Sequence, residues 1–444
     1  MKITFLGAGS SVFTKNVLGD VMLTDSITDL HIALYDIDGE RLNDSKAIMD
    51  TLNANINSNR ARITAHLGVD ERKQALASAD FIVNAIQVGG YDPSTIIDFE
   101  IPKKYGLRQT IGDTLGVAGI FRALRTIPVL ADIAKDIEEV CPDAWFLNYT
   151  NPMSILTGYM QRFTAVKTVG LCHSVQKCAS KLLRTVDMEE FSEDARWKIA
   201  GINHMGWLLE ITDSKGADLY PEIRRRAAEK NAQARRAGAE KHNDMVRFDI
   251  LEKFGYYNTE SSEHTAEYHP YYIKNQFPDL IEEFNIPLDE YPRRCKKQIE
   301  EWKKQREELI NDNGLGHEKT HEYASATMDA IVNDNPLEIG GNVINHGMIP
   351  NLPEKACVEI PCLVNRNGVQ GVYVGTLPEH LAALNRTHIN VHLVTLDAAV
   401  EKKREHVYHA AMLDPHTRSE LKLDEIRKLC DEMFEAHAEM IKIC

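Results

Sequence analysis

Apolar positions along the first 175 residues recur in short runs, and stretches with the period of an amphipathic helix separate these runs. Six runs have the length and the β-branched content of buried strands: 2–6, 31–36, 62–66, 80–86, 145–149 and 167–171. The intervening stretches, such as RLNDSKAIMDTLNAN and RALRTIPVLADIAKDIEEV, place apolar residues three and four positions apart. Because parallel strands need crossover connections, this alternation predicts an α/β fold with a doubly wound parallel sheet of the Rossmann type.

The pattern changes after about residue 195. WKIAGIN and WLLEITDS predict two paired strands, polar helices follow, and CVEIPCLVNRNGVQGVYVG predicts a β-rich stretch before closing helices. The basic run 224–242 is interpreted as a solvated helix face. We therefore predict a Rossmann domain over 1–195 and an α+β domain over 196–444. The second domain would be of the lactate and malate dehydrogenase kind and would carry substrate, metal and oligomer contacts.

Composition narrows the class of protein. With 43% hydrophobic and 26% charged residues over 444 positions, the chain is typical of a globular protein large enough for two domains. A formal charge of −15 argues against nucleic acid as the main partner, and no apolar run reaches the length of a membrane span. The start, MKITFLGAGS, lacks the apolar segment of a secretory signal. The eight cysteines have no disulfide-type spacing, which predicts a reducing, cytoplasmic location.

A glycine turn, FLGAGSSVF, follows the first predicted strand. Gly7 and Gly9 supply the first two glycines of the dinucleotide fingerprint, while its third position is occupied by Val12. Glycines are needed in this turn because backbone N–H groups must approach a pyrophosphate closely at the helix N-terminus. A tight structural turn would use the same residues, so the turn by itself leaves both interpretations open.

The acid at the end of the second predicted strand favours the dinucleotide. Asp36 suits the ribose hydroxyls of NAD, although it lies more than 20 residues beyond the turn. The strand, turn and helix context and the further β/α units agree with this interpretation. We therefore predict that Gly7, Gly9, Ser10 and Asp36 bind NAD, with Arg41 leaving NADP open.

Polar motifs follow three of the predicted strands. NYTNPM contains Asn151, VGLCHSVQ contains Cys172, and GINHMGW contains His204. Ligands of open α/β sheets bind beyond the carboxyl ends of the strands, so we expect these three side chains to lie close together. Each has a simpler explanation on its own: a buried cysteine packs as a small hydrophobe, a histidine is often structural, and asparagine before proline forms turns.

One cysteine and one histidine make a sparse metal site that leaves positions for water and substrate hydroxyls, as catalytic sites do. Ser174 is predicted to cap the following helix, whose dipole would favour a thiolate at Cys172. A reactive nucleophile and simple packing are the other possibilities for this cysteine. Zinc is the usual ion for cysteine and histidine, whereas sugar and water oxygens suit a harder ion.

Two further segments carry candidate chemistry. RQTIGDTLGVAGIFRALRTIP (108–128) has small residues suited to close approach and places Asp113 in a loop. TESSEHTAEYHPYY (259–272) is denser in acids, histidines and tyrosines than a solvated helix face requires. A tyrosine in this segment can act as a base only if its pKa of about 10 is lowered or its proton is passed on.

Taken in order, these motifs resemble glycoside hydrolase family 4, the NAD- and metal-dependent glycosidases, over essentially the whole chain. The resemblance rests on ITFLGAGS, QTIGDTLG, GIFRALRTIP, NYTNPM, GLCHS, GINHM and ESSEHTAEY, and it is strongest to the α-galactosidase branch. It implies oxidation at C3 of the sugar by NAD, removal of the C2 proton, elimination of the aglycone, water addition and re-reduction. The family is a recognised exception to the two-carboxylate rule of glycosidases.

The resemblance also implies roles for individual residues. Cys172 and His204 match the metal ligands, with Mn²⁺ as the implied ion, and Asn151 matches a substrate-contacting asparagine. Tyr268 matches the proposed C2 base, and Asp113 matches an acid thought to raise its basicity.

His173 stands where phospho-sugar members of the family carry an aspartate proposed as the leaving-group acid. An imidazolium can perform that role near neutral pH. Substrates of the melibiose type and a homodimer or homotetramer are further implications of the resemblance.

Several alternatives remain open from the sequence. Within the family, α-glucosidase and α-galacturonidase or glucuronidase specificities are possible. Arg293 and Arg294 could bind an acidic substituent or simply lie on a solvated helix. Outside the family, a net NAD-dependent dehydrogenase would share the fold, and a non-catalytic NAD-linked sugar sensor would have no need of a metal pair.

Overall fold

A computed structural model describes residues 1–236, 238–312 and 314–443. Within these residues, twelve strands form one sheet in the order β3-β2-β1-β4-β5-β6-β10-β11-β7-β8-β9, with β12 paired to β11. The strands are β1 (Lys2–Leu6), β2 (His31–Asp36), β3 (Arg62–Leu67), β4 (Phe81–Asn84), β5 (Trp145–Asn148), β6 (Lys167–Leu171), β7 (Arg196–Ile202), β8 (Met205–Thr212), β9 (Tyr257–Asn258), β10 (Leu337–Ile344), β11 (Cys357–Asn365) and β12 (Gly368–Gly371).

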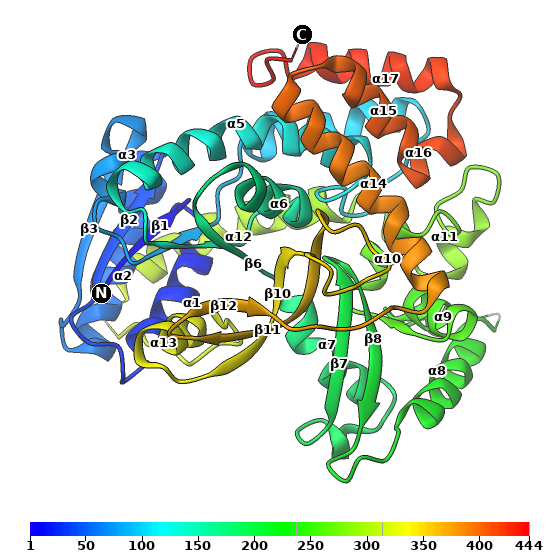
Figure 1. Cartoon of the computed structure of the whole chain (residues 1–444), viewed down its shortest axis with the longest axis horizontal. Helices are drawn as coiled ribbons and strands as arrows, with labels where there is room; N and C mark the ends of the chain where they lie inside the picture. Colours follow the sequence, from blue (N-terminus) through cyan, green and yellow to red (C-terminus); the bar gives the residue numbers. More distant parts are fainter. Residues whose placement is uncertain (237, 313, 444) are drawn as a thin grey trace.

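Helices cover the sheet, and the C-terminal helices form a group at one side of the molecule (Figure 1). The α-helices are α1 (Ser11–Met22), α2 (Gly39–Asn57), α3 (Gly68–Leu76), α4 (Ile96–Lys104), α5 (Gly116–Val140), α6 (Met153–Phe163), α7 (His173–Thr185), α8 (Tyr220–Ala234), α9 (Met245–Phe254), α10 (Ser262–Tyr268), α11 (Asp279–Glu283), α12 (Glu290–Asn311), α13 (Ala324–Asn333), α14 (Glu379–Glu401), α15 (Arg404–Leu413), α16 (Pro415–Glu420) and α17 (Leu423–Ala436). Two short helical turns, η1 (Gly90–Thr95) and η2 (Glu189–Phe191), complete the set. No helix among the described residues is long and apolar enough to cross a membrane.

The first six strands are parallel and follow the order 3-2-1-4-5-6 of dinucleotide-binding sheets. All six predicted strands are present, with ends that differ by at most a few residues from the predicted ones. Buried parallel strands read as continuous apolar runs because helices cover both of their faces. The predicted Rossmann-type sheet is therefore confirmed by the strand order.

The second half of the chain continues the same sheet. β10 pairs antiparallel with β6 at Asn342↔Gly170 and Gly341↔Leu171, and β11 joins β10 to the hairpin of β7 and β8. The predicted boundary at residue 195 therefore falls between strands of one continuous sheet, and the division into two domains stays a prediction. This continuity places the ends of β6 and of the β7–β8 hairpin near each other.

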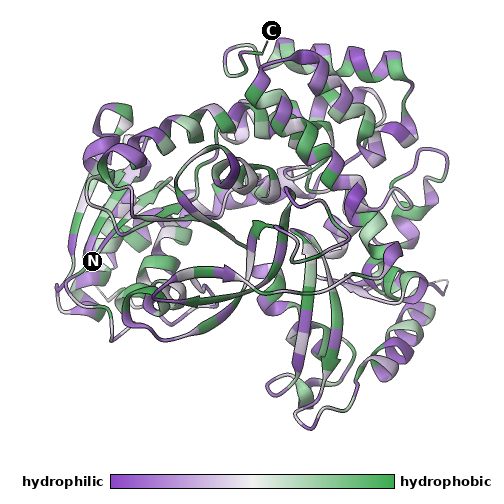
Figure 2. Cartoon of the chain, viewed as in Figure 1, coloured by the Kyte–Doolittle hydropathy of each residue, from purple (hydrophilic) through white to green (hydrophobic). Residues whose placement is uncertain are grey.

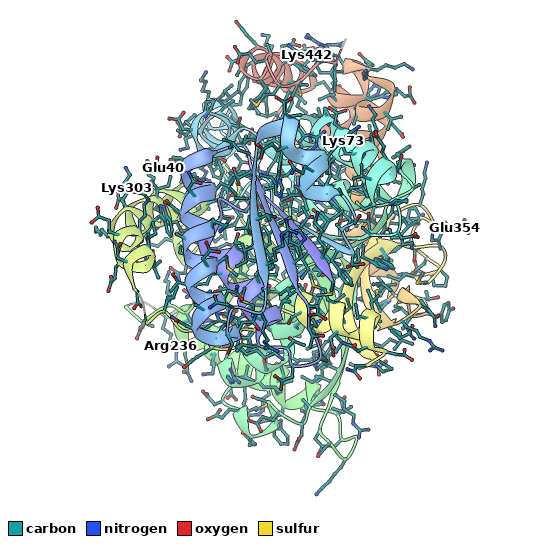
Figure 3. The ribbon with its side chains drawn as sticks, turned by 90° about the vertical axis from the view of Figure 1, so that its left-hand side faces the viewer. Glu40, Lys73, Arg236, Lys303, Glu354 and Lys442 are labelled. Carbon is teal, nitrogen blue, oxygen red and sulfur yellow. The ribbon has the colours of Figure 1, made fainter. Side chains whose placement is uncertain are left out.

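The core lies on both faces of the parallel strands. Phe5 packs with α1, whereas Ile82 and Phe146 face α5, which also contacts α3, α6 and α14. Figure 2 shows apolar stretches along the central strands. Full burial of one phenylalanine or isoleucine side chain stabilises the fold by roughly 1.5–3 kcal/mol. Charged side chains such as Lys73 and Glu354 lie at the periphery (Figure 3).

The basic run is largely on the surface. Its first part lies in α8, where Arg225 is exposed and forms ion pairs of 2.6 Å with Glu222 and 2.7 Å with Glu229. Residue 237 of the run lies outside the described residues. The contacts of α8 therefore match the predicted solvated face.

Candidate metal and active site

The glycine turn and the acid predicted to bind a dinucleotide lie together. Gly7 has a φ of +85°, and a Cβ there would stand 2.7 Å from the carbonyl oxygen of Ala85, so only glycine fits. The N–H of Gly9 donates to Oδ2 of Asp36 over 2.6 Å. Ser10 is the N-cap of α1 and its side chain makes no capping bond. The structure thus brings all four predicted residues to the helix N-terminus, where phosphates bind, and NAD binding by them stays a prediction.

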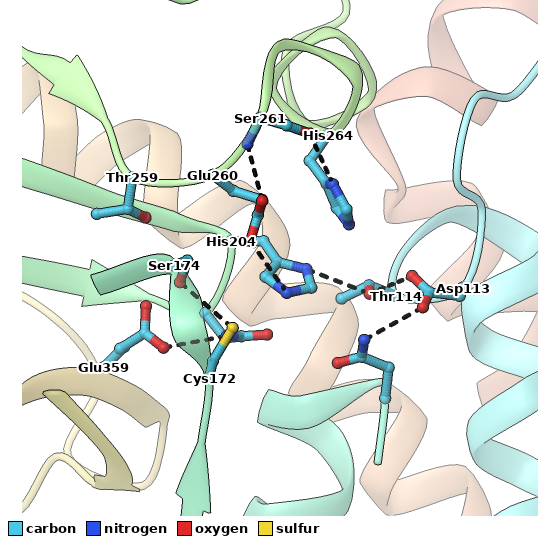
Figure 4. Close-up of polar contacts among 12 residues, drawn as sticks. Asp113, Thr114, Cys172, Ser174, His204, Thr259, Glu260, Ser261, His264 and Glu359 are labelled. Atoms are coloured by element: carbon cyan, nitrogen blue, oxygen red, sulfur yellow. Dashed lines mark hydrogen bonds and ion pairs between the residues drawn. The ribbon is translucent and has the colours of Figure 1, made fainter. Parts of the chain in front are cut away.

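Three potential metal ligands meet at the carboxyl edge of the sheet (Figure 4). The ligand atoms of Cys172, His204 and Glu260 all lie within 4.8 Å of one another. Cys172 ends β6 as the N-cap of α7, and His204 lies in the two-residue turn between β7 and β8. His204 has a φ of +62°, a left-handed conformation that is uncommon for residues other than glycine. Glu260 lies two residues before α10.

The sequence analysis brought Cys172 and His204 together but missed Glu260. The only signal for it was the density of acids in 259–272, which does not say which acid faces the site. Oε2 of Glu260 lies 3.8 Å from Nε2 of His204. Burial raises the pKa of the Glu260 carboxyl, but His264, His204 and the N–H of Ser261 outweigh burial and lower it.

The neighbours of His204 favour its protonated form. Burial lowers the pKa of His204, yet the sulfur of Cys172 together with Glu260 and Asp113 raises it to about 10. His264 packs edge-on against His204 with ring centroids 4.3 Å apart. Burial and the charge of His204 lower the pKa of His264 to about 4. A sulfur, an imidazole and a carboxylate form a donor set that fits a divalent cation.

Asp113, Thr114 and Asn151 form a hydrogen-bonded chain that ends at the cluster. Nδ2 of Asn151 donates to Oδ2 of Asp113 over 3.1 Å, and the Thr114 hydroxyl donates to Oδ1 of Asp113 over 2.7 Å. The same hydroxyl lies 3.4 Å from Nδ1 of His204. Oδ1 of Asn151 is buried and has no hydrogen-bond partner among the described residues, so it is an acceptor available to a ligand.

Asp113 carries a stable negative charge. Burial raises the pKa of its carboxyl, but Arg122, His264 and His204 outweigh burial and lower it. Arg122 is itself buried, and its Nε donates to the carbonyl oxygen of Asn151 over 3.2 Å. Sequence reasoning missed Arg122 because it lies inside the helical stretch that follows the loop.

Tyr268 is almost completely buried beside the cluster, with 1% of its surface exposed. Its hydroxyl donates to the carbonyl oxygen of Asn203 over 3.2 Å. Burial, followed by the charge of Asp113, raises the pKa of the phenol well above its usual value. The phenol therefore holds its proton in this arrangement, which is the opposite of the lowered pKa that a base requires, and its role as the C2 base stays a prediction.

His173 lies outside the three-ligand cluster. It is the first residue of α7, and its Nε2 lies 2.6 Å from Oε2 of Glu322, whose side chain is 10% exposed. Glu322 precedes α13 and gave no signal in the sequence. The structure thus supplies His173 with a carboxylate partner, and its role as leaving-group acid stays a prediction.

The cap of the helix after β6 lies two residues earlier than predicted. Cys172, not Ser174, is the N-cap of α7, so the predicted cap was wrong. Ser174 lies in the first turn, and its hydroxyl donates to Sγ of Cys172 over 3.3 Å. The serine therefore contacts the proposed ligand directly.

A buried carboxylate supports the turn that carries His204. Oε1 of Glu359, on β11, accepts hydrogen bonds from Nδ2 of Asn203 over 3.0 Å and from Nδ2 of Asn342 over 2.9 Å. Glu359 is fully buried. Sequence reasoning missed it because a lone acid within an apolar strand does not reveal its partner.

The fold and the cluster together define a Rossmann-type enzyme with a cation-binding constellation at the carboxyl edge of its sheet. The family model "Family 4 glycosyl hydrolase" matches residues 2–188, and "Family 4 glycosyl hydrolase C-terminal domain" matches residues 199–417. The chain belongs to family 4 of the glycosyl hydrolases, as the motifs predicted.

Two curated relatives match nearly the whole chain. An α-galactosidase of Bacillus subtilis is 56% identical over 440 residues, covering 99% of both chains. An α-galacturonidase of Thermoanaerobacter italicus is 29% identical over 457 residues, covering 100% of this chain and 97% of its own.

Solved structures share the fold. The putative glucosidase lplD of Bacillus subtilis matches with a TM-score of 0.85 at 27% identity, covering 98% of this chain and 99% of its own. A 6-phospho-α-glucosidase from gut microorganisms, solved in complex with NAD and Mn²⁺, matches with a TM-score of 0.81 at 22% identity, covering 100% and 99%. A malate dehydrogenase of Plasmodium falciparum matches with a TM-score of 0.53 at 13% identity, covering 90% and 99%. The predicted fold class is confirmed by these matches.

Proposed function

We propose that the chain is an α-galactosidase that cleaves melibiose-type glycosides with NAD and a divalent cation as cofactors. Mn²⁺ is the proposed cation. The observation that carries the proposal is the 56% identity to an α-galactosidase over 99% of both chains. A structural relative solved with NAD and Mn²⁺ supports the cofactors. The cysteine, histidine and carboxylate cluster supports the cation independently, because its donor atoms fit such an ion.

Two sets of residues are proposed to bind NAD and the cation. Gly7, Gly9, Ser10 and Asp36 would hold the dinucleotide, and Cys172, His204 and Glu260 would hold the cation. When bound, NAD supplies a hydride acceptor for C3 of the sugar, and the cation supplies a Lewis acid for the C2 and C3 oxygens. Asn151 would contact a sugar hydroxyl through its unpartnered Oδ1.

Tyr268 would remove the proton at C2. Its pKa is raised by burial and by Asp113, so the phenol needs a compensating positive charge before it can ionise. A cation held beside it by Cys172 and His204 would lower that pKa, because an opposite charge favours the phenolate. Burial of the phenol also keeps bulk water away from the proton that it takes up.

His173 would protonate the leaving oxygen. The carboxylate of Glu322, 2.6 Å from its Nε2, orients the ring. The ring remains partly exposed, with 38% of its side chain accessible, so an aglycone can reach it.

We further propose a cytoplasmic location and a homodimer or homotetramer. The seven described cysteines are all free, which agrees with a reducing compartment. The oligomer is proposed from the family resemblance alone.

Hydrolysis of a panel of nitrophenyl glycosides tests the proposal. We expect the α-galactoside to be cleaved only when NAD, Mn²⁺ and a reductant are all present, with no net NADH. Faster cleavage of an α-galacturonide would favour the activity of the 29% identical relative instead. Stoichiometric NADH would favour a dehydrogenase and refute the proposal.

A further inference from the structure

The pairing of β6 with β10 ends just before Cys172, the residue proposed as the sulfur ligand. β6 and β10 pair at Gly170↔Asn342 and Leu171↔Gly341, and the next pair in this antiparallel register would join Cys172 to Gly340. That pair does not form. The N–H and carbonyl groups of Cys172 and the carbonyl group of Gly340 instead face the hydroxyl of Tyr323, a buried residue at the N-cap of α13.

One phenol satisfies the backbone of Cys172 on both sides. The Tyr323 hydroxyl accepts a hydrogen bond of 2.7 Å from the N–H of Cys172. It also lies 2.9 Å from the carbonyl oxygen of Cys172 and 3.3 Å from that of Gly340, either of which can accept its single proton. The hydroxyl therefore replaces one rung of the β6–β10 ladder.

This replacement fixes where the sulfur points. Cys172 has φ −136° and ψ 137°, an extended conformation between the end of β6 and the start of α7. Without the phenol, its N–H and carbonyl groups would be free to turn toward Gly340, and the Cα–Cβ bond would turn with them. A buried backbone group without a partner is strongly disfavoured, so the phenol determines which orientation is stable.

We infer that Tyr323 is a positioning residue that aims the sulfur of Cys172 at the cation between His204 and Glu260. The inference rests on the proposed metal role of Cys172 and adds a residue to it. Residues that orient metal ligands without touching the metal typically change metal affinity by about 10- to 100-fold when substituted.

The chain offers a matched control in Tyr220. This buried tyrosine also accepts a hydrogen bond from a backbone N–H, that of Tyr257 at 3.2 Å, and donates to a backbone carbonyl, that of Leu208. It belongs to the apolar cluster formed by α7, α8 and β8 and does not contact the three ligands. Tyr220→Phe therefore removes the same kind of hydrogen bonds without touching the cluster.

Cobalt titration of the full chain tests the inference, because Co²⁺ bound to a thiolate has a charge-transfer absorption that reports on the Co–S bond. We expect Tyr323→Phe to bind Co²⁺ about 10- to 100-fold more weakly than the unchanged chain and to show a shifted or weaker band. NAD binding should be unchanged in this variant. Tyr220→Phe should lower the melting temperature similarly and leave both the Co²⁺ affinity and the band as they are.

The outcomes separate the inference from the proposal beneath it. An unchanged affinity and band in folded Tyr323→Phe would overturn the positioning role while leaving Cys172 as a ligand. If Tyr323→Phe does not fold, Tyr323→His serves instead, because the histidine ring keeps a polar atom in the buried site but is shorter than the phenol. An unchanged Co²⁺ band in Tyr323→His would also overturn the inference. A band that is absent from the unchanged chain, or that persists in Cys172→Ser, would overturn both the metal assignment and the inference.

Discussion

Nδ2 of Asn151 donates a 3.1 Å hydrogen bond to Oδ2 of Asp113, which joins the loop before α5 to the end of β5. The two residues are far apart in the sequence, and each was singled out there for a separate reason. Their contact directs the unpartnered Oδ1 of Asn151 into the buried site. The hydrogen bond therefore links Asn151, the proposed substrate contact, to the carboxylate of Asp113, whose charge raises the pKa of Tyr268.

Replacing Asp113 by asparagine should weaken this coupling. The substitution removes the charge and replaces one acceptor oxygen by an N–H group that faces Nδ2 of Asn151. Losing a charge-assisted hydrogen bond costs about 1.5–3 kcal/mol, so kcat/KM for a nitrophenyl α-galactoside should fall by about 10- to 100-fold. Asp143→Asn, at a carboxylate that is 97% exposed, should have no effect. Equal losses in both variants would contradict the prediction.

Cys172→Ser should abolish metal-dependent turnover while NAD still binds. Serine presents a neutral hydroxyl in place of a thiolate, and the cluster loses one of its three ligand atoms. Calorimetric titration with Mn²⁺ and, separately, with NAD distinguishes the two effects. Cys178→Ser, at a buried cysteine on the same helix, is the control and should retain metal binding. Full activity of Cys172→Ser would remove the metal hypothesis.

Tyr268→Phe should suppress exchange of the C2 proton of the sugar with solvent deuterium. The phenol is the proposed base, and loss of a general base lowers the rate by about 10²- to 10⁴-fold. Mass spectrometry of recovered substrate measures the exchange. Tyr271→Phe, at a tyrosine that is 49% exposed, should exchange normally. Complete exchange with Tyr268→Phe would place the base on another residue.

The free energy of unfolding should fall as the pH drops below about 6.5. Burial, together with His388, lowers the pKa of His392 from 6.5 to about 3, so its imidazole is neutral in the folded state. The unfolded chain binds a proton there at higher pH, and stability is lost as the pH falls from 6.5 toward 3, by about 1.4 kcal/mol per pKa unit.

Urea unfolding of His392→Gln measures this dependence. The variant should show a flatter pH profile between pH 6.5 and 4 than the unchanged chain. His409→Gln, at a side chain that is 53% exposed, should leave the profile as it is. A profile of His392→Gln that parallels the unchanged chain would contradict the prediction.

Part of this site was predictable because strand ends carry it. Buried parallel strands produce apolar runs that are easily recognised, and their carboxyl ends share one edge of the sheet. Cys172 follows β6 directly, and His204 follows β7 after one residue. The strand ends singled out both residues, but β7 runs antiparallel to β6 by way of β10 and β11, so the shared edge of the parallel strands does not by itself explain their contact.

The remaining residues of the site arrive by tertiary packing. Glu260, Glu322 and Tyr323 come from segments before α10 and α13 whose position depends on how those helices dock. Nothing in the local sequence distinguishes Tyr323 from the other tyrosines of the chain. The two-residue error in the predicted cap, Ser174, has a different origin, since a helix boundary depends on backbone hydrogen bonds that residue type only biases.

The pairing of β10 with β6 also fixes the order in which the site can be assembled during synthesis. A chain that ends at residue 195 already contains Cys172, but β6 then pairs only with β5 and its other edge is open. Tyr323 and β10 emerge only with residues 323–344, and Glu260 precedes them. If Tyr323 orients Cys172 as proposed, a ribosome must complete about three quarters of the chain before the cysteine is oriented, and we expect cation loading to follow the pairing of β10 with β6.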